Sequence, residues 1–137
     1  MRKESPENIF YACDLNEKEE RKGYFVTYED DNMLSMFDGI VSNSVIEHID
    51  NTIQAWRYFN QLLKPVADGG GVMVHSFPSQ LHFDWSHWGL KIANHLCLFS
   101  KTSLNIVCDK SGFKLIKWGY STKLRWPVLY FQKSRDI

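Results

Sequence analysis

One stretch in the middle of the chain decides the fold: Phe37-Asp38-Gly39-Ile40-Val41-Ser42-Asn43-Ser44-Val45-Ile46-Glu47-His48-Ile49-Asp50. Its first part, residues 37–41, is short and largely apolar, which predicts a buried strand. The three small polar residues that follow, 42–44, predict a loop at the carboxyl end of this strand. Open α/β sheets bind their ligands at such strand ends, so this loop is a candidate binding site.

The segment after this stretch predicts the clearest helix of the chain. Asp50 or Asn51 can cap its amino end, and Pro65 stops it. Four large apolar residues fall on one helical face: Ile53, Trp56, Phe59 and Leu63. Residues 69–71 are glycines that predict a turn out of the helix, and residues 72–74 predict another buried strand. A strand, a helix and a strand in this order form a βαβ unit, which favours a parallel sheet.

Two short strands are predicted before this unit. Residues 9–13 form an apolar run that stops at Asp14, and residues 24–28 alternate between apolar and polar side chains. A polar cluster, residues 29–32, follows the second of these runs.

A helix and a strand pair are predicted near the carboxyl end. Ser100 or Thr102 can cap the helix, and Gly112 is positioned as its stop. Residues 113–118 and 128–131 alternate with a turn between them, which favours an antiparallel pair. The expected fold is therefore of the α/β class, with a mostly parallel sheet that ends in an antiparallel strand pair.

Length and composition favour a folded, neutral protein. At 137 residues, the chain suits one domain, so residues 1–137 are expected to share one core. The formal net charge is zero, which gives no overall attraction to nucleic acid or to an anionic membrane. Cys13, Cys97 and Cys108 match no disulfide or zinc pattern, and no stretch approaches the ~18 apolar residues of a membrane helix. We therefore expect a cytoplasmic protein.

Several motifs together resemble those of a known enzyme family. Residues 37–49, extended by Asp50, resemble the "FDxIxxxxVLEHxxD" segment of small class I S-adenosylmethionine-dependent methyltransferases, called type 11 or type 23. Residues 62–65 and 69–71 are similar to the family's "LLKPGG" turn. The family's "TP...H...LRLFS...L...GF" succession has its counterpart in residues 76–78, 87, 96–100 and 111–113. The resemblance covers roughly residues 9–131 and implies a partial Rossmann-like methyltransferase fold that binds S-adenosylmethionine.

The resemblance implies six cofactor-binding residues: Asp14, Asp30, Asp31, Ser42, Asn43 and Ser44. Asp14 would accept hydrogen bonds from the ribose hydroxyls, because a carboxylate can chelate a vicinal diol. Asp30 and Asp31, with Asn32, would contact the adenine amine. Residues 42–44 would line the methionine end of the cofactor. Each assignment has a structural alternative. Asp14 could be an exposed turn aspartate, residues 30–32 could form a polar turn, and residues 42–44 could form a tight turn.

Histidines raise two further questions. Glu47 and His48 match the family's Glu-His pair, which implies that His48 removes or positions a proton; a hydrogen-bonded structural histidine is the alternative. His82, Asp84 and His87 form an HxDxxH cluster, whose spacing fits neither the usual zinc motifs nor one helical face. No metal is predicted there. A polar and aromatic loop over the substrate is favoured, with plain surface or core packing as the alternatives.

One defining motif of the family has no counterpart. Its glycine-rich loop should precede the acidic residue by ~20 residues, but only thirteen residues precede Asp14 and none is glycine. The domain is therefore expected to lack the first strand, the first helix and that loop. Its sheet would expose an edge that can pair with another copy or with a partner chain.

Two functions remain in competition. The first is methyl transfer from S-adenosylmethionine to a small-molecule, lipid or sugar acceptor. The alternative is a non-catalytic binding or assembly module that retains the methyltransferase fold. A metal-dependent hydrolase built on the HxDxxH cluster is a distant third.

Overall fold

The computed structural model describes residues 11–12, 24–25, 33–77, 97, 99–120 and 127–137. The chain divides into two compact units, Met1–Met33 and Leu34–Ile137. In the first unit, β1 (Tyr11–Ala12) pairs in parallel with β2 (Tyr24–Phe25), so a strand lies within each of the two early predicted ranges. Asp14, Asp30 and Asp31 lie outside the described residues.

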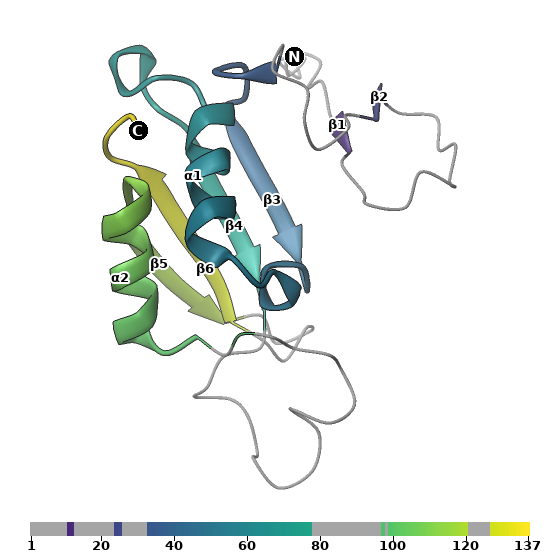
Figure 1. Cartoon of the computed structure of the whole chain (residues 1–137), viewed down its shortest axis with the longest axis vertical. Coiled ribbons are helices and arrows are strands. Elements are labelled where there is room, and N and C mark those ends of the chain that lie inside the picture. Colours follow the sequence, from purple (N-terminus) through teal and green to yellow (C-terminus); the bar gives the residue numbers. More distant parts are fainter. Residues whose placement is uncertain (1–10, 13–23, 26–32, 78–96, 98, 121–126) are drawn as a thin grey trace, which may run out of the picture. The chain divides into compact units, whose positions relative to one another are not determined.

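The second unit is built on a four-stranded sheet with the order β3-β4-β6-β5 (Figure 1). Its strands are β3 (Gly39–Asn43), β4 (Val72–Ser76), β5 (Phe113–Tyr120) and β6 (Pro127–Lys133). β3 and β4 are parallel, whereas β6 runs antiparallel to both β4 and β5. The predicted βαβ unit and the predicted antiparallel pair are thus confirmed, and β6 joins them into one mixed sheet.

One predicted strand is displaced along the chain. β3 covers residues 39–43 and not the predicted 37–41, so Ser42 and Asn43 belong to the strand and only Ser44 leaves it. The cause is the pairing with β4, in which Gly39 lies opposite Val72 and Asn43 lies opposite Ser76. The apolar pattern locates a strand, but its ends are set by a partner that is distant in sequence.

Helix α1 (Thr52–Leu62) follows the predicted boundaries closely. Asn51 is the cap, because its side chain accepts a hydrogen bond from the Gln54 backbone N–H at 3.2 Å. Trp56 lies in the middle of the helix and is completely buried against the sheet. Leu63, also completely buried, follows the last helical residue.

Helix α2 (Lys101–Ser111) begins with a capping box. The Ser100 side chain accepts from the Ser103 backbone N–H at 3.1 Å, and the Ser103 hydroxyl is 2.9 Å from the Ser100 backbone nitrogen. Gly112 ends the helix in the left-handed conformation, at φ 76°. Both the Ser100 cap and the Gly112 stop were predicted from the sequence.

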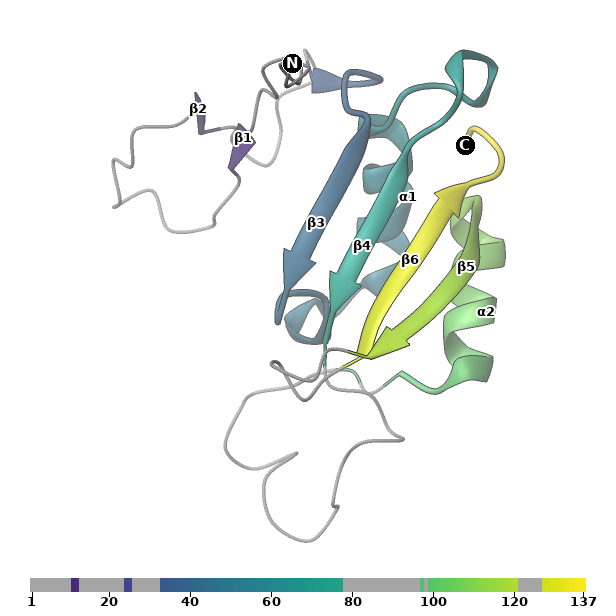
Figure 2. The same ribbon diagram turned by 180° about the vertical axis from the view of Figure 1, so that it is seen from behind.

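α1 and α2 pack on the same face of the sheet (Figure 2). The core lies between these helices and the sheet, where Met73, Leu129 and Phe131 are completely buried. The opposite side, here called the open face, carries a row of register partners from β3, β4 and β6: Val41, Val74 and Tyr130. Val41 is 80% exposed. Among the described segments, none forms a helix long and apolar enough to cross a membrane.

The end of the chain is tied to both helices by a group here called the C-terminal clamp: Asn60, Gly112, Lys133, Arg135 and Asp136. The buried Asn60 side chain donates to the Ser111 carbonyl at 3.0 Å and to the Arg135 carbonyl at 2.9 Å. Lys133 Nζ donates to the carbonyls of Asn60 and Leu63, at 2.8 and 3.0 Å. These are carbonyls at the end of α1 that the helix itself leaves without a partner.

Candidate functional site

The candidate site begins where the two parallel strands end together. Asn43 and Ser76 are register partners, and the Ser44 backbone N–H donates to the Ser76 carbonyl at 2.8 Å. Ser44 has φ 54°, so the chain turns sharply as it leaves β3. The Asn43 side chain is exposed there and offers both a donor and an acceptor. The structure therefore brings Ser42, Asn43 and Ser44 together at the carboxyl edge of the sheet.

Ser42 pairs with a buried histidine on the neighbouring strand. Its Oγ lies 2.6 Å from Nδ1 of His75, and both side chains face α1. The His75 ring packs against Trp56, Phe59 and Phe131, with centroid separations of 5.5, 5.9 and 5.8 Å. Burial among these rings lowers the pKa of His75 to about 3, so the imidazole is neutral at physiological pH.

Glu47 and His48 follow the edge in a short 3₁₀ turn, Ile46–His48. Glu47 is completely buried, and this burial raises the pKa of its carboxyl group above the usual value. The His48 side chain is 40% exposed, and its Nε2 lies 4.0 Å from the Glu47 carboxylate. The turn thus directs the acidic residue inward and the histidine outward, which is the accessibility a proton acceptor for a substrate requires.

Asp14, Asp30 and Asp31 lie outside the described residues, as do His82, Asp84 and His87. Within the part of the chain that the structure describes, no group of His, Cys, Asp and Glu side chains is arranged to hold a metal ion. His75 is the residue that the sequence did not connect with the site. His75 directly follows the predicted strand 72–74, and because side chains alternate along a strand it falls on the same face as Met73. This alternation was the signal that the sequence offered.

The model of the methyltransferase domain family matches residues 2–117, which is most of the chain. The chain belongs to this family. No curated protein sequence matches this methyltransferase domain.

Solved structures support the fold of the methyltransferase domain. It resembles the 1,6-didemethyltoxoflavin-N1-methyltransferase of Burkholderia thailandensis, solved with 1,6-didemethyltoxoflavin and S-adenosylhomocysteine: TM-score 0.65, 17% identity, covering 90% of this chain and 60% of that one. An S-adenosylmethionine-dependent methyltransferase of Mesorhizobium loti gives TM-score 0.63 at 13% identity, covering 90% and 80% of the two chains. A methyltransferase of Thermotoga maritima, described as a possible histamine N-methyltransferase, gives a TM-score of 0.60 at 14% identity. The match covers 82% of this chain and 64% of that one.

These structures share the fold of the methyltransferase domain at low sequence identity. The chain spans 60% of the length of the Burkholderia enzyme. The Rossmann-like α/β architecture expected from the sequence is therefore confirmed, as is the mixed sheet with its antiparallel end.

The methyltransferase domain should lose stability in mild acid through His75. Between pH 6.5 and about 5.5, the loss in unfolding free energy should be about 1 kcal/mol. In the unfolded chain, His75 takes up a proton near the ordinary histidine pKa of 6.5. In the folded state its imidazole stays neutral down to a pKa of about 3, so acid favours unfolding. Urea unfolding of the wild type and of His75→Phe at both pH values would measure this effect.

The comparison with His75→Phe is needed because Glu47 acts in the opposite direction. Its raised pKa makes the folded state bind more protons than the unfolded state, so mild acid stabilises the fold through this group. Glu47 is present in both proteins, so its contribution cancels in the difference. Equal pH dependence in the two proteins would show that His75 is not held neutral.

Proposed function

We propose that the methyltransferase domain uses S-adenosylmethionine to methylate a small-molecule, lipid or sugar acceptor. Family membership over residues 2–117 carries this proposal. The paired carboxyl ends of β3 and β4 support it, because α/β sheets of this kind bind their ligands there. The formal net charge of zero favours a small molecule over nucleic acid as the substrate.

The residues at the carboxyl edge suit the methionine end of the cofactor. A ligand that carries both an ammonium and a carboxylate needs acceptors and donors, and the exposed Asn43 amide and the Ser42 hydroxyl supply both. Ser44 would border the same end. Asp14 is proposed to hold the ribose, and Asp30 and Asp31 the adenine.

When bound, the cofactor supplies a methyl group that its sulfonium already activates. The domain's own residues therefore have to orient the two reactants in line, because alignment accounts for much of the rate of such a transfer. We assign His48 the removal or positioning of the acceptor proton. Its exposure and its place four residues beyond Ser44 support this role.

Calorimetric titration with S-adenosylhomocysteine tests this function. The wild type should release or absorb heat on binding, and Asn43→Ala should weaken the affinity by about tenfold, the usual effect of losing one polar contact. Asn105→Ala is the matched control, because Asn105 is exposed on α2, away from the carboxyl edge. Absence of heat with millimolar ligand and a folded protein would overturn the enzymatic function.

The alternative function, a binding or assembly module, is favoured by β3, which is an edge strand of the four-stranded sheet that the described residues form. This strand contains no charged residue, and its Val41 side chain is 80% exposed. Natural edge strands usually carry charges or proline, which prevent pairing with other chains. We therefore propose that β3 pairs with a second copy or with a partner chain.

Light scattering coupled to size exclusion would test pairing between copies. The wild type should contain a species of twice the chain mass, and Val41→Lys should contain the single chain, because a charge on an edge strand disfavours pairing. A variant that retains the larger species would exclude β3 from the contact.

Free Cys97 and Cys108 are consistent with the proposed location of the protein in the cytoplasm.

A further inference from the structure

The open face of the sheet has an apolar part on β3, β4 and β6. Val41 lies on this face, and so do Val74 and Val72 of β4, because side chains two residues apart share one face of a strand. Val41 is 80% exposed and Val72 is 38% exposed. Tyr130 continues the apolar part toward β5. A sheet face that meets water normally carries polar side chains, so this apolar part indicates a face that another element covers.

The same face has a basic part on β5. Lys114 is the register partner of Gln132, which in turn pairs with Val72. Lys117 is the register partner of Tyr130, and its ammonium group lies over the Tyr130 ring, 5.4 Å from the centroid. Both lysines therefore lie on the open face, beside its apolar part. None of the four strands contains an Asp or Glu residue, so the sheet itself supplies no acidic partner for either lysine.

The two parts together specify the chemistry of the element that would cover them. We propose that the open face binds an amphipathic helix of a partner protein, whose apolar stripe packs on the valines and whose acidic side chains pair with Lys114 and Lys117. One helix can present both kinds of side chain, because residues three and four positions apart share one of its faces. Figure 2 views the sheet from the open side, with α1 and α2 behind it. The proposal is independent of methyl transfer.

A second copy of the chain fits the open face less well than an acidic helix. Two copies stacked by their open faces would bring together the lysines of both sheets, and neither sheet would supply an acidic side chain. Like charges across an interface disfavour association, whereas opposite charges favour it. The lysines therefore favour a partner of negative charge over self-association through this face.

Titration with a synthetic peptide tests the proposal. The peptide is a helix of about five turns, with leucines along one stripe and glutamates beside them. In NMR spectra of the labelled chain, the resonances of Val41, Val74 and Lys117 should shift on binding, whereas those of Ile106 on α2 should not. A matched peptide with lysine in place of each glutamate should bind about tenfold more weakly at low salt. Equal affinity for the two peptides, no binding of the acidic one, or shifts confined to other surfaces would overturn the proposal.

Substitutions on the open face test its two parts separately. Fluorescence anisotropy of the labelled acidic peptide should show that Val41→Ser weakens the affinity about tenfold, because an apolar side chain that binding would bury is lost. Lys117→Glu should weaken it about tenfold, because repulsion replaces attraction. Ile106→Ser and Lys110→Glu are the matched controls, since both residues are exposed on α2, on the other side of the sheet. Losses as large in these controls would overturn the proposal, and circular dichroism would verify that each variant is folded.

Lys117→Glu also separates this surface from the edge pairing proposed for β3. Lys117 lies on β5, and β3 and β5 are the opposite edges of the four-stranded sheet that the described residues form. The species of twice the chain mass should therefore persist in this variant. Its loss would mean that the open face contacts a second copy, which would overturn the acidic helix as the occupant. A wild type that binds the acidic peptide but forms no such species would support the helix and exclude pairing between copies.

Discussion

Replacing Gly112 by alanine is expected to lower the free energy of unfolding by about 3 kcal/mol, through strain and a steric clash together. Gly112 has φ 76°, a conformation that residues with a Cβ atom rarely adopt. A Cβ there would also lie 2.6 Å from the Arg135 carbonyl oxygen and 2.7 Å from Nδ2 of Asn60. Both atoms belong to the C-terminal clamp, so the methyl group would force apart the contacts that hold α1, α2 and the chain end together.

Gly69→Ala is a matched control for this effect. Gly69 also has a left-handed conformation, at φ 98°, but a Cβ added to it would meet nothing within 4 Å. Its replacement should therefore cost about 1 kcal/mol, which is the backbone strain alone. Urea denaturation of both variants gives the two values. Equal losses would mean that crowding in the clamp adds nothing to the strain.

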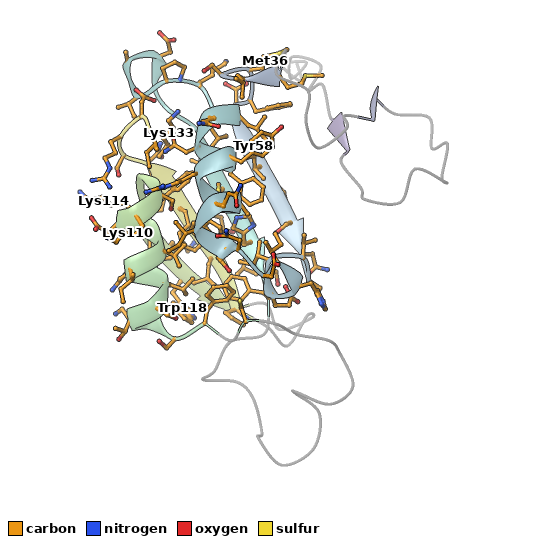
Figure 3. All side chains as sticks on the ribbon, viewed as in Figure 1. Met36, Tyr58, Lys110, Lys114, Trp118 and Lys133 are labelled. Atoms are coloured by element: carbon orange, nitrogen blue, oxygen red, sulfur yellow. The ribbon has the colours of Figure 1, made fainter. Side chains whose placement is uncertain are left out.

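Lys133→Met should cost a similar amount, about 3 kcal/mol, because it removes charge-assisted hydrogen bonds from a buried site. The Lys133 side chain is 3% exposed, and its ammonium group contacts two carbonyls at the end of α1 as well as the Asp136 carboxylate at 2.8 Å. Figure 3 shows Lys133 beside the end of this helix. Methionine fills a similar volume but leaves both carbonyls without a donor.

Lys114→Met is the control for the lysine substitution. Lys114 lies on β5 and is exposed, so its replacement should change the unfolding free energy by less than about 0.5 kcal/mol. Asp136 is exposed as well, and the hydrogen bond from Lys133 lowers the pKa of its carboxyl group. Asp136→Asn should thus be milder than Lys133→Met. Equal effects would mean that the ion pair, and not the capping of α1, supplies the stability.

The helices could be predicted from the sequence because their signals are local. Asn51 and Ser100 cap from the position immediately before each helix, and Gly112 ends the second helix from the position after it. Spacing of apolar residues also identified the buried side of α1 around Trp56. The ends of β3 could not be predicted in the same way, because the pairing of Gly39 with a residue of β4 depends on the sheet as a whole.

The candidate site was predicted in part. Residues 42–44 were assigned to a strand end, and the structure brings them to that edge, although two of them lie within β3. The contact between Ser42 and His75 could not be derived from the sequence, since the two residues are 33 positions apart and meet through strand register. The inward direction of the Glu47 side chain and the outward direction of the His48 side chain likewise arise from a short 3₁₀ turn, which no periodic sequence pattern predicts.

The position of β6 has a consequence for how the protein is made. β6 is the last strand in the chain, yet it lies between β4 and β5, which never pair with each other. A ribosome releases β4 about fifty residues before β6, at a rate of roughly 5–20 residues per second. For those seconds, Trp56 lacks its packing partner Phe131, and the backbone groups of β4 that pair with β6 have no partner strand. Completion of the sheet must therefore wait until β6 has been synthesised, and a chaperone that shields emerging apolar segments would raise the yield of the folded protein.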